Sequence, residues 1–259
     1  MSAGAKPIWE GVFGSFAEAG GEATVFEGTI WLDKVVDRAR TALAQAAGGA
    51  IAPVTVSTDY ALPLLAAASS RRDRPLRILD FGGGMGTSYV PLRAMVPAER
   101  PIEFVVVENE AITERGNALF AEDESIRFRS DLPSAPDRFD IVHFGSSLHY
   151  VDDWRGLLAK VTALRPTWLA FADLTAADNR TFVTTQRYYD RLIPVRFWNV
   201  DEFIAAVCAL GFELVLKSRY RGYYLAPGAE LPTANFDAEH RLAYTSQLVF
   251  RNTSVSVGQ

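Results

Sequence analysis

The chain has 259 residues, of which 49% are hydrophobic and 22% are charged, and these values exclude a disordered or fibrous protein. Its net charge of -5 disfavours a general nucleic-acid binder, because neutralising phosphates requires a clustered basic surface. The single cysteine, Cys208, excludes an intrachain disulfide, so we expect a cytoplasmic protein. No apolar stretch is long enough to cross a membrane, and none is expected to insert into one.

The first 74 residues are expected to form an N-terminal helical extension. Apolar residues recur at helical spacing in 29–46, and 59–68 predicts a further helix. The aromatic residues Trp9, Phe13, Phe16 and Trp31 leave two interpretations open. They either dock the extension on the remainder of the chain, which we favour, or form a lid over a ligand. The second domain is then 75–259.

Strands and helices alternate from Leu76 onward. Apolar runs of strand length are separated by helical segments near 87–96, 110–120 and 152–163, and the runs are 76–81, 102–107, 139–144 and 167–171. This alternation predicts a parallel sheet with helices on both faces. After a helix near 200–210, which would bury Cys208, two further strands at 212–220 and 244–250 lack a long intervening helix. Such a pair is better joined antiparallel.

A glycine-rich turn follows the first of these strands, in the segment Asp80-Phe-Gly-Gly-Gly-Met-Gly86. Glycine takes positive φ and lets backbone N–H groups approach a ligand, so the turn predicts a nucleotide-like ligand. A phosphate-binding P-loop would end in Gly-Lys-Ser/Thr, which is absent here. The dinucleotide fingerprint needs a third glycine where Thr87 stands, so its register fails.

The spacing of Asp80, Gly82, Gly84 and Gly86 resembles motif I of class I S-adenosylmethionine-dependent methyltransferases. The resemblance runs from about residue 75 to the end of the chain. It implies S-adenosylmethionine as cofactor and an α/β, Rossmann-like fold with a mostly parallel seven-stranded sheet and an antiparallel last strand. It implies cofactor contacts from the glycine turn and from the ends of later strands, namely from Asp80, Gly82, Gly83, Gly84, Gly86, Glu108, Asp131, Leu132 and Ser146.

Two of these residues have a role that the resemblance specifies. Glu108 matches the acidic residue at the end of the family's second strand, which accepts hydrogen bonds from a ribose diol. Residues 126–132 resemble the family's third strand and the turn that contacts adenine, in which Asp131 is placed to accept from the adenine amino group. The alternatives are a solvated strand end for Glu108 and an ordinary turn aspartate for Asp131.

A second resemblance concerns the N-terminal segment Trp-Glu-Gly-Val-Phe of residues 9–13, together with 184–189. Both segments are similar to a set of bacterial methyltransferases. The resemblance implies that the extension belongs to the enzyme, and it carries no substrate over.

His149 is the candidate catalytic residue, as a base or as a substrate-orienting group, because it follows the fourth strand at the carboxyl edge of the sheet. A base is optional, since alignment contributes more to methyl transfer. The candidate acceptor contacts are Tyr150, Gln186, Tyr188 and Tyr189. Residues 171–193 could equally be a surface excursion that packs on its own aromatic side chains.

No metal is expected. His143, His149, Asp152 and Asp153 could form a metal site, but adjacent carboxylates before a helix usually cap it, and His143 within a strand is expected to lie in the core. The sequence therefore predicts methylation of an oxygen or nitrogen of a small molecule. The alternatives are a cofactor-binding scaffold without activity, or an aminopropyl transferase or NAD-dependent enzyme on a related fold. The acceptor and the oligomeric state stay open.

Overall fold

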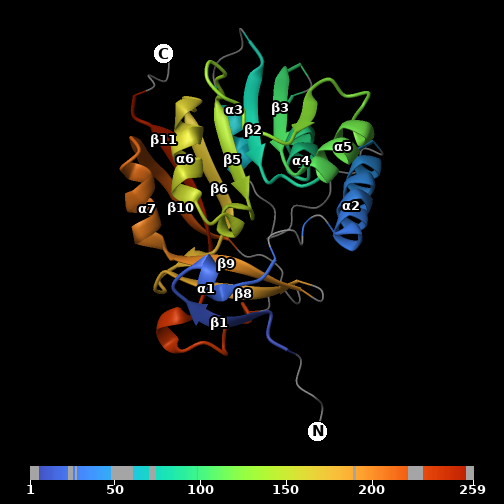
Figure 1. Cartoon of the computed structure of the whole chain (residues 1–259). Coiled ribbons are helices and arrows are strands. Elements are labelled where there is room, and N and C mark those ends of the chain that lie inside the picture. Colours follow the sequence, from blue (N-terminus) through green and yellow to red (C-terminus); the bar gives the residue numbers. More distant parts are fainter. Residues whose placement is uncertain are drawn as a thin grey trace.

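A seven-stranded sheet forms the centre of the computed structural model, which describes residues 6–22, 26, 28–47, 61–69, 74–97, 99–188, 191–220 and 230–254 (Figure 1). The strand order is β10-β11-β6-β5-β2-β3-β4. β11 alone runs antiparallel to its neighbours in this sheet, which confirms the predicted fold class. The strands are β2 (Leu76–Phe81), β3 (Ile102–Val107), β4 (Ile126–Arg129), β5 (Ile141–Gly145), β6 (Trp168–Leu174), β10 (Phe212–Tyr220) and β11 (Thr245–Asn252).

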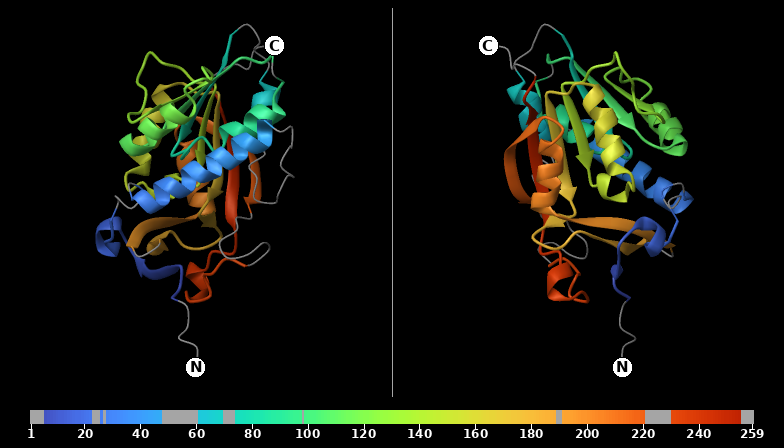
Figure 2. Two further views of the ribbon diagram at one scale, coloured as in Figure 1. Left: turned by 90° about the vertical axis from the view of Figure 1, so that its right-hand side faces the viewer. Right: turned by 60° about the vertical axis from the view of Figure 1, so that its left-hand side comes forward.

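Helices cover both faces of this sheet (Figure 2). One face packs against α2 (Thr29–Ala47), α3 (Ala61–Ala68), α4 (Tyr89–Met95) and α5 (Glu110–Leu119), and the other against α6 (Trp154–Ala163) and α7 (Val200–Cys208). Neighbouring strand residues alternate between the two layers, since Ile78 packs on the first set of helices and Leu79 on the second. These helices and strands confirm the alternation predicted from the sequence.

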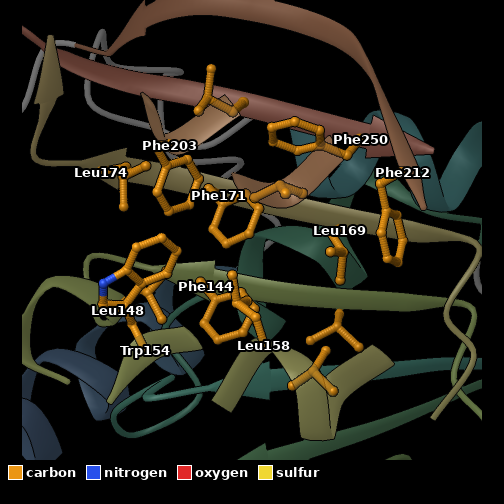
Figure 3. Close-up of a cluster of buried hydrophobic side chains, with 14 of the residues drawn as sticks. Phe144, Leu148, Trp154, Leu158, Leu169, Phe171, Leu174, Phe203, Phe212 and Phe250 are labelled. Carbon is orange, nitrogen blue, oxygen red and sulfur yellow. The ribbon is translucent and has the colours of Figure 1, made fainter. Parts of the chain in front are cut away.

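Aromatic rings fill the layer under α6 and α7 (Figure 3). Phe144 of β5 stacks on Phe171 of β6 with ring centroids 5.1 Å apart. Phe203 of α7 meets Phe171 edge to face and stacks against Trp154 of α6. Because these rings are buried, they hold the ends of β5 and β6 in a fixed relation to each other.

A second, four-stranded sheet lies at one end of the first (Figure 1). Its order is β1-β8-β9-β7, formed by β1 (Trp9–Phe13), β8 (Phe182–Tyr188), β9 (Arg191–Asn199) and β7 (Ala176–Ala177). β1 pairs antiparallel with β8, so that Trp9 lies opposite Gln186. This sheet was not predicted from the sequence. Its first strand comes from a region with a helical pattern, and its partner follows more than 170 residues later.

Trp9 anchors the N-terminal strand. Its side chain is only 1% exposed and meets Phe197 of β9 edge to face, with ring centroids 5.3 Å apart. The Trp9 carbonyl accepts a hydrogen bond from Asn235 Nδ2 at 2.8 Å. For Trp9, the structure therefore agrees with docking of the N-terminal segment on the rest of the chain. The short helix α1 (Phe16–Ala19) follows, where the Phe16 ring lies under the Arg196 guanidinium.

The prediction of a buried Cys208 was wrong. Cys208 is exposed at the last position of α7, whose buried side chains are Val200, Phe203 and Val207. Position 208 follows Val207 by one residue and so turns away from the core by about 100°. None of the helices within the described ranges combines the length and apolar character needed to cross a bilayer.

We expect Trp9→Ala to lower the free energy of unfolding by about 3–5 kcal/mol, because it empties a buried aromatic site. Val12→Ala changes a 46% exposed residue of the same strand and should cost no more than about 0.5 kcal/mol. Urea unfolding of the full chain measures both. Equal costs for the two variants would mean that β1 is not part of the folded core.

Candidate functional site

The glycine turn lies at the carboxyl end of β2, between the ends of β3 and β5. Gly82 has φ +67°, and a Cβ built there would lie 2.4 Å from Ser147 Cβ, so the turn touches the segment after β5. Gly84 has φ +56°, but a Cβ built there would meet no atom of the described residues within 4 Å. Glycine at 82 therefore permits a close contact, whereas glycine at 84 leaves space open beside the turn.

Asp80 lies beneath this turn and is fully buried. Its Oδ1 is 2.7 Å from Nδ1 of His143 on β5. His143 is buried, as predicted, and its partner in the core is this carboxylate. The other oxygen, Oδ2, lies against the turn, because a Cβ built on Gly83 would be 2.3 Å from it. Among the described residues, this buried Oδ2 has no hydrogen-bond partner. The pair joins the two central strands directly below the turn.

Glu108 follows β3 and is bonded to the turn. Its Oε1 accepts from the Gly84 N–H at 3.0 Å and its Oε2 from the Asn109 N–H at 3.1 Å. Burial raises the pKa of Glu108, and the two N–H groups partly oppose that shift. Asn109 also caps α5 by accepting from the Ile112 N–H at 3.0 Å. The N–H groups of Gly84 and Asn109 therefore fix the position of the Glu108 carboxylate, one at each oxygen.

Asp131 and Leu132 follow β4 at the same edge. Asp131 is exposed, and the hydrogen bond from Arg129 Nη2 to its Oδ2 at 2.6 Å lowers the pKa of its carboxyl group. Leu132 is partly buried against the aromatic layer under α6 and α7. The two residues thus lie beyond the strand end that pairs with β3, as the sequence analysis expected of the third strand.

Ser146 and Asp173 end the adjacent strands β5 and β6 in the left-handed backbone conformation, with φ values of +54° and +51°. The Ser146 N–H donates to the Ala172 carbonyl at 2.9 Å, and Ser146 Oγ donates to Asp173 Oδ2. Thr245 Oγ1 donates to Asp173 Oδ1 at 2.6 Å. Asp173 was not singled out from the sequence. A carboxylate near the end of the predicted fifth strand was the available signal.

His149 lies in the short 3-10 helix η2 (Leu148–Tyr150) and is 3% exposed. Burial lowers the pKa of His149 to about 3, so the imidazole is neutral at ordinary pH. Its Nδ1 makes no hydrogen bond within the described part of the chain. The neighbouring Tyr150 O–H donates to Gln186 Oε1 at 2.9 Å, and burial raises the pKa of Tyr150. His149 and Tyr150 are therefore both uncharged at ordinary pH.

An aromatic group gathers beside Tyr150. The Phe26 ring lies 4.9 Å from the Tyr150 ring and 5.7 Å from the Tyr188 ring, and it also contacts Trp31 at 5.4 Å. The Phe26 carbonyl accepts from Asn109 Nδ2 at 3.4 Å, which links this group to the residue after Glu108. The structure thus brings Tyr150, Gln186 and Tyr188 together, and Phe26 joins them without a signal in the sequence. Tyr189 lies outside the described residues.

The acidic pair before α6 acts locally. Asp153 caps the helix by accepting from the Gly156 N–H at 2.9 Å, as predicted. Asp152 pairs with Arg196 at 3.1 Å. The described residues do contain one group with metal-ligand atoms close together, Asp237, Glu239 and His240, in which both carboxylates are exposed. Exposed acidic groups of this kind are common without an ion.

Comparison with known proteins gives one family. The family described as "Methyltransferase domain" matches residues 56–217. No curated protein matches the chain.

Solved structures share the fold at low identity. A Burkholderia thailandensis 1,6-didemethyltoxoflavin-N1-methyltransferase with bound 1,6-didemethyltoxoflavin and S-adenosylhomocysteine is 17% identical, covering 86% of this chain and 89% of its own, with a TM-score of 0.52. LepI in complex with SAM is 14% identical, covering 78% and 49%, with a TM-score of 0.51. The YcgJ protein from Bacillus subtilis is 15% identical, covering 76% and 99%, with a TM-score of 0.50.

The depressed pKa of His149 predicts a pH dependence of stability. Between its folded value of about 3 and its ordinary value of 6.5, the unfolded chain binds a proton that the folded chain does not. Stability therefore rises with pH across this window and is lost as the pH falls through it. Between about pH 7 and about pH 5, His149→Gln should lose about 2 kcal/mol less of its unfolding free energy than the unmodified chain.

Urea unfolding at both pH values measures this difference. Tyr150→Phe, which changes the neighbouring ring and no group that titrates in this window, should follow the unmodified chain. A pH slope unchanged in His149→Gln would mean that His149 accepts a proton in the folded state.

Proposed function

The chain belongs to the methyltransferase domain family and is an S-adenosylmethionine-dependent methyltransferase, and we propose that it methylates an oxygen or nitrogen of a small molecule. The proposal of a small acceptor is supported by the Burkholderia protein, whose structure holds 1,6-didemethyltoxoflavin together with S-adenosylhomocysteine. It is also supported by the net charge of -5, which disfavours nucleic acid as the acceptor. The single cysteine agrees with a cytoplasmic location.

The residues at the glycine turn fit the cofactor. The open space beside Gly84 admits a ligand where any side chain would intrude. Glu108 points to the turn and has acceptor positions on both carboxylate oxygens, which suits a ribose diol. The buried Asp80 Oδ2 suits a ligand donor group or a water. We propose that Asp80, Glu108 and the glycines hold the cofactor, with Asp131, Leu132 and Ser146 at the neighbouring strand ends.

The observation that carries the proposal is the bond from Gly84 N–H to Glu108. It joins the turn after the first core strand to the acidic residue after the second, so the two motifs of the sequence form one site. When bound, S-adenosylmethionine supplies a methyl group that its sulfonium makes electrophilic. The chain's own task is then to align the acceptor, and effective molarity can contribute about 7–11 kcal/mol to such a step.

His149 is proposed as an orienting group in this step. A neutral buried imidazole can give or accept a hydrogen bond without taking up charge, whereas a general base must become charged in an environment that disfavours charge. Tyr150, Gln186 and Tyr188 are proposed to contact the acceptor, with the Tyr150 to Gln186 bond fixing their relation. Tyr189 stays a prediction.

The N-terminal segment is proposed to be part of the enzyme. The pairing of β1 with β8 and the contacts of Phe26 with Tyr150 and Tyr188 support this. Its resemblance to bacterial methyltransferases stays a prediction, as does the division at residue 74.

Gly84→Val should weaken binding of S-adenosylhomocysteine by about 100-fold or more, because its side chain occupies the space beside the turn. Isothermal titration calorimetry measures the affinity. Gly211→Val is the matched control, since Gly211 also has positive φ and open space around its Cβ position but follows α7. It should bear a similar backbone strain and bind like the unmodified chain.

Wild-type affinity in Gly84→Val would refute the assignment of the turn to the cofactor. If the chain instead binds NAD and binds neither S-adenosylmethionine nor S-adenosylhomocysteine, a nicotinamide-dependent enzyme would be favoured.

A further inference from the structure

A buried histidine and a buried carboxylate meet directly beneath the glycine turn. Asp80 of β2 and His143 of β5 are 0% and 1% exposed, and they are neighbours in the parallel ladder of the two central strands. His143 Nδ1 lies 2.7 Å from Asp80 Oδ1. Because carboxylate oxygens accept hydrogen bonds, the imidazole N–H is the donor. The hydrogen bond therefore joins a residue of the proposed cofactor site to a histidine of the core.

Both side chains of this pair extend toward the carboxyl ends of their strands. A Cβ built on Gly83 would lie 2.3 Å from Asp80 Oδ2 and 2.6 Å from its Cγ, so the turn packs against this carboxylate. On β5, a Cβ built on Gly145 would lie 2.9 Å from His143 Cε1. Glycine at 83 and at 145 leaves the room that each side chain occupies. The imidazole thus reaches along β5 toward the end of the sheet where the turn lies.

The hydrogen bond determines which way the carboxylate faces. With Oδ1 held by His143, Oδ2 lies against Gly83, and this buried oxygen has no hydrogen-bond partner among the described residues. A buried carboxylate that lost its donor would rotate or take up water to regain a partner. Either change would displace the atoms against which the turn packs. The next residue, Gly84, carries the N–H that donates to Glu108.

We propose that His143 is a positioning residue for the cofactor, which acts through Asp80 to hold the glycine turn in its binding geometry. This rests on the proposed function and deepens it, since it assigns a role in cofactor binding to a histidine of the core. A histidine that only stabilised the fold would leave cofactor affinity independent of the donor beside Asp80. A positioning residue makes the affinity depend on that donor.

Two substitutions of similar shape separate these roles. Leucine and asparagine both branch at Cγ, and the asparagine amide nitrogen is bonded to Cγ, as Nδ1 is in histidine. His143→Asn therefore keeps a donor beside Asp80, whereas His143→Leu removes it. Val142→Ala is the matched control, because Val142 is fully buried in the same strand but packs in the layer under α6 and α7.

Isothermal titration calorimetry of the full chain with S-adenosylhomocysteine measures the affinity, and a melting temperature is recorded for each variant. We expect His143→Leu to weaken binding by about tenfold, the size typical of a hydrogen bond to a charged group. His143→Asn should stay within about threefold of the unmodified chain. Val142→Ala should lower the melting temperature and bind like the unmodified chain.

A double variant tests whether His143 acts through Asp80. Asp80→Ala removes the carboxylate, so adding His143→Leu to it should weaken binding by no more than about twofold. The double variant carries no unpaired buried carboxylate. If His143→Leu alone fails to fold, its comparison with Asp80→Ala therefore still decides, and a larger further loss of affinity overturns the proposal.

The other outcomes separate this inference from the proposed function. The positioning role is overturned if His143→Leu binds like the unmodified chain, or if His143→Asn binds as weakly as His143→Leu. It is also overturned if Val142→Ala weakens binding as much as His143→Leu, because the loss would then follow stability alone. If S-adenosylhomocysteine does not bind the unmodified chain, the proposed function itself fails.

Discussion

The close approach of two turns, one after β2 and one after β5, is the constraint on which the site depends. A Cβ at Gly82 would overlap Ser147, and directly below, Asp80 and His143 join the same two strands through a buried hydrogen bond. A buried carboxylate is tolerated only where it is hydrogen-bonded, so this pair couples the position of the glycine turn to the register of the central strands. In the same turn, the Gly84 N–H donates to Glu108, and a Cβ built on Gly84 would meet no atom of the described residues within 4 Å.

The four-stranded sheet lies at the carboxyl edge of the seven-stranded sheet (Figure 1). Its strands β8 and β9 follow β6 in the chain, and the N-terminal strand β1 pairs with β8 at one edge of the sheet. Trp9 is buried in one apolar cluster with Phe182 of β8 and Phe197 of β9, so the first strand is held by apolar burial as well as by its backbone hydrogen bonds to β8. Gln186 lies opposite Trp9 and accepts a hydrogen bond from Tyr150, which connects the N-terminal strand to η2.

Charge is distributed unequally across the edge. Burial keeps His149 and Tyr150 neutral, while the Glu108 carboxylate accepts a hydrogen bond from the glycine turn. The left-handed residues Ser146 and Asp173 lie at the ends of the paired strands β5 and β6.

Local pattern was sufficient to predict the seven-stranded sheet, its helices and the glycine-rich turn, because strand and helix periods and the steric needs of glycine are properties of short segments. Glu108 could be anticipated for the same reason, since it directly ends a predicted strand. Other contacts join residues that are far apart in the chain. They are the pairing of β1 with β8, the aromatic contacts of Phe26, and the hydrogen bonds from Ser146 and Thr245 to Asp173. No short-range pattern encodes such contacts, and the burial that makes His149 neutral likewise arises only when distant segments pack around it.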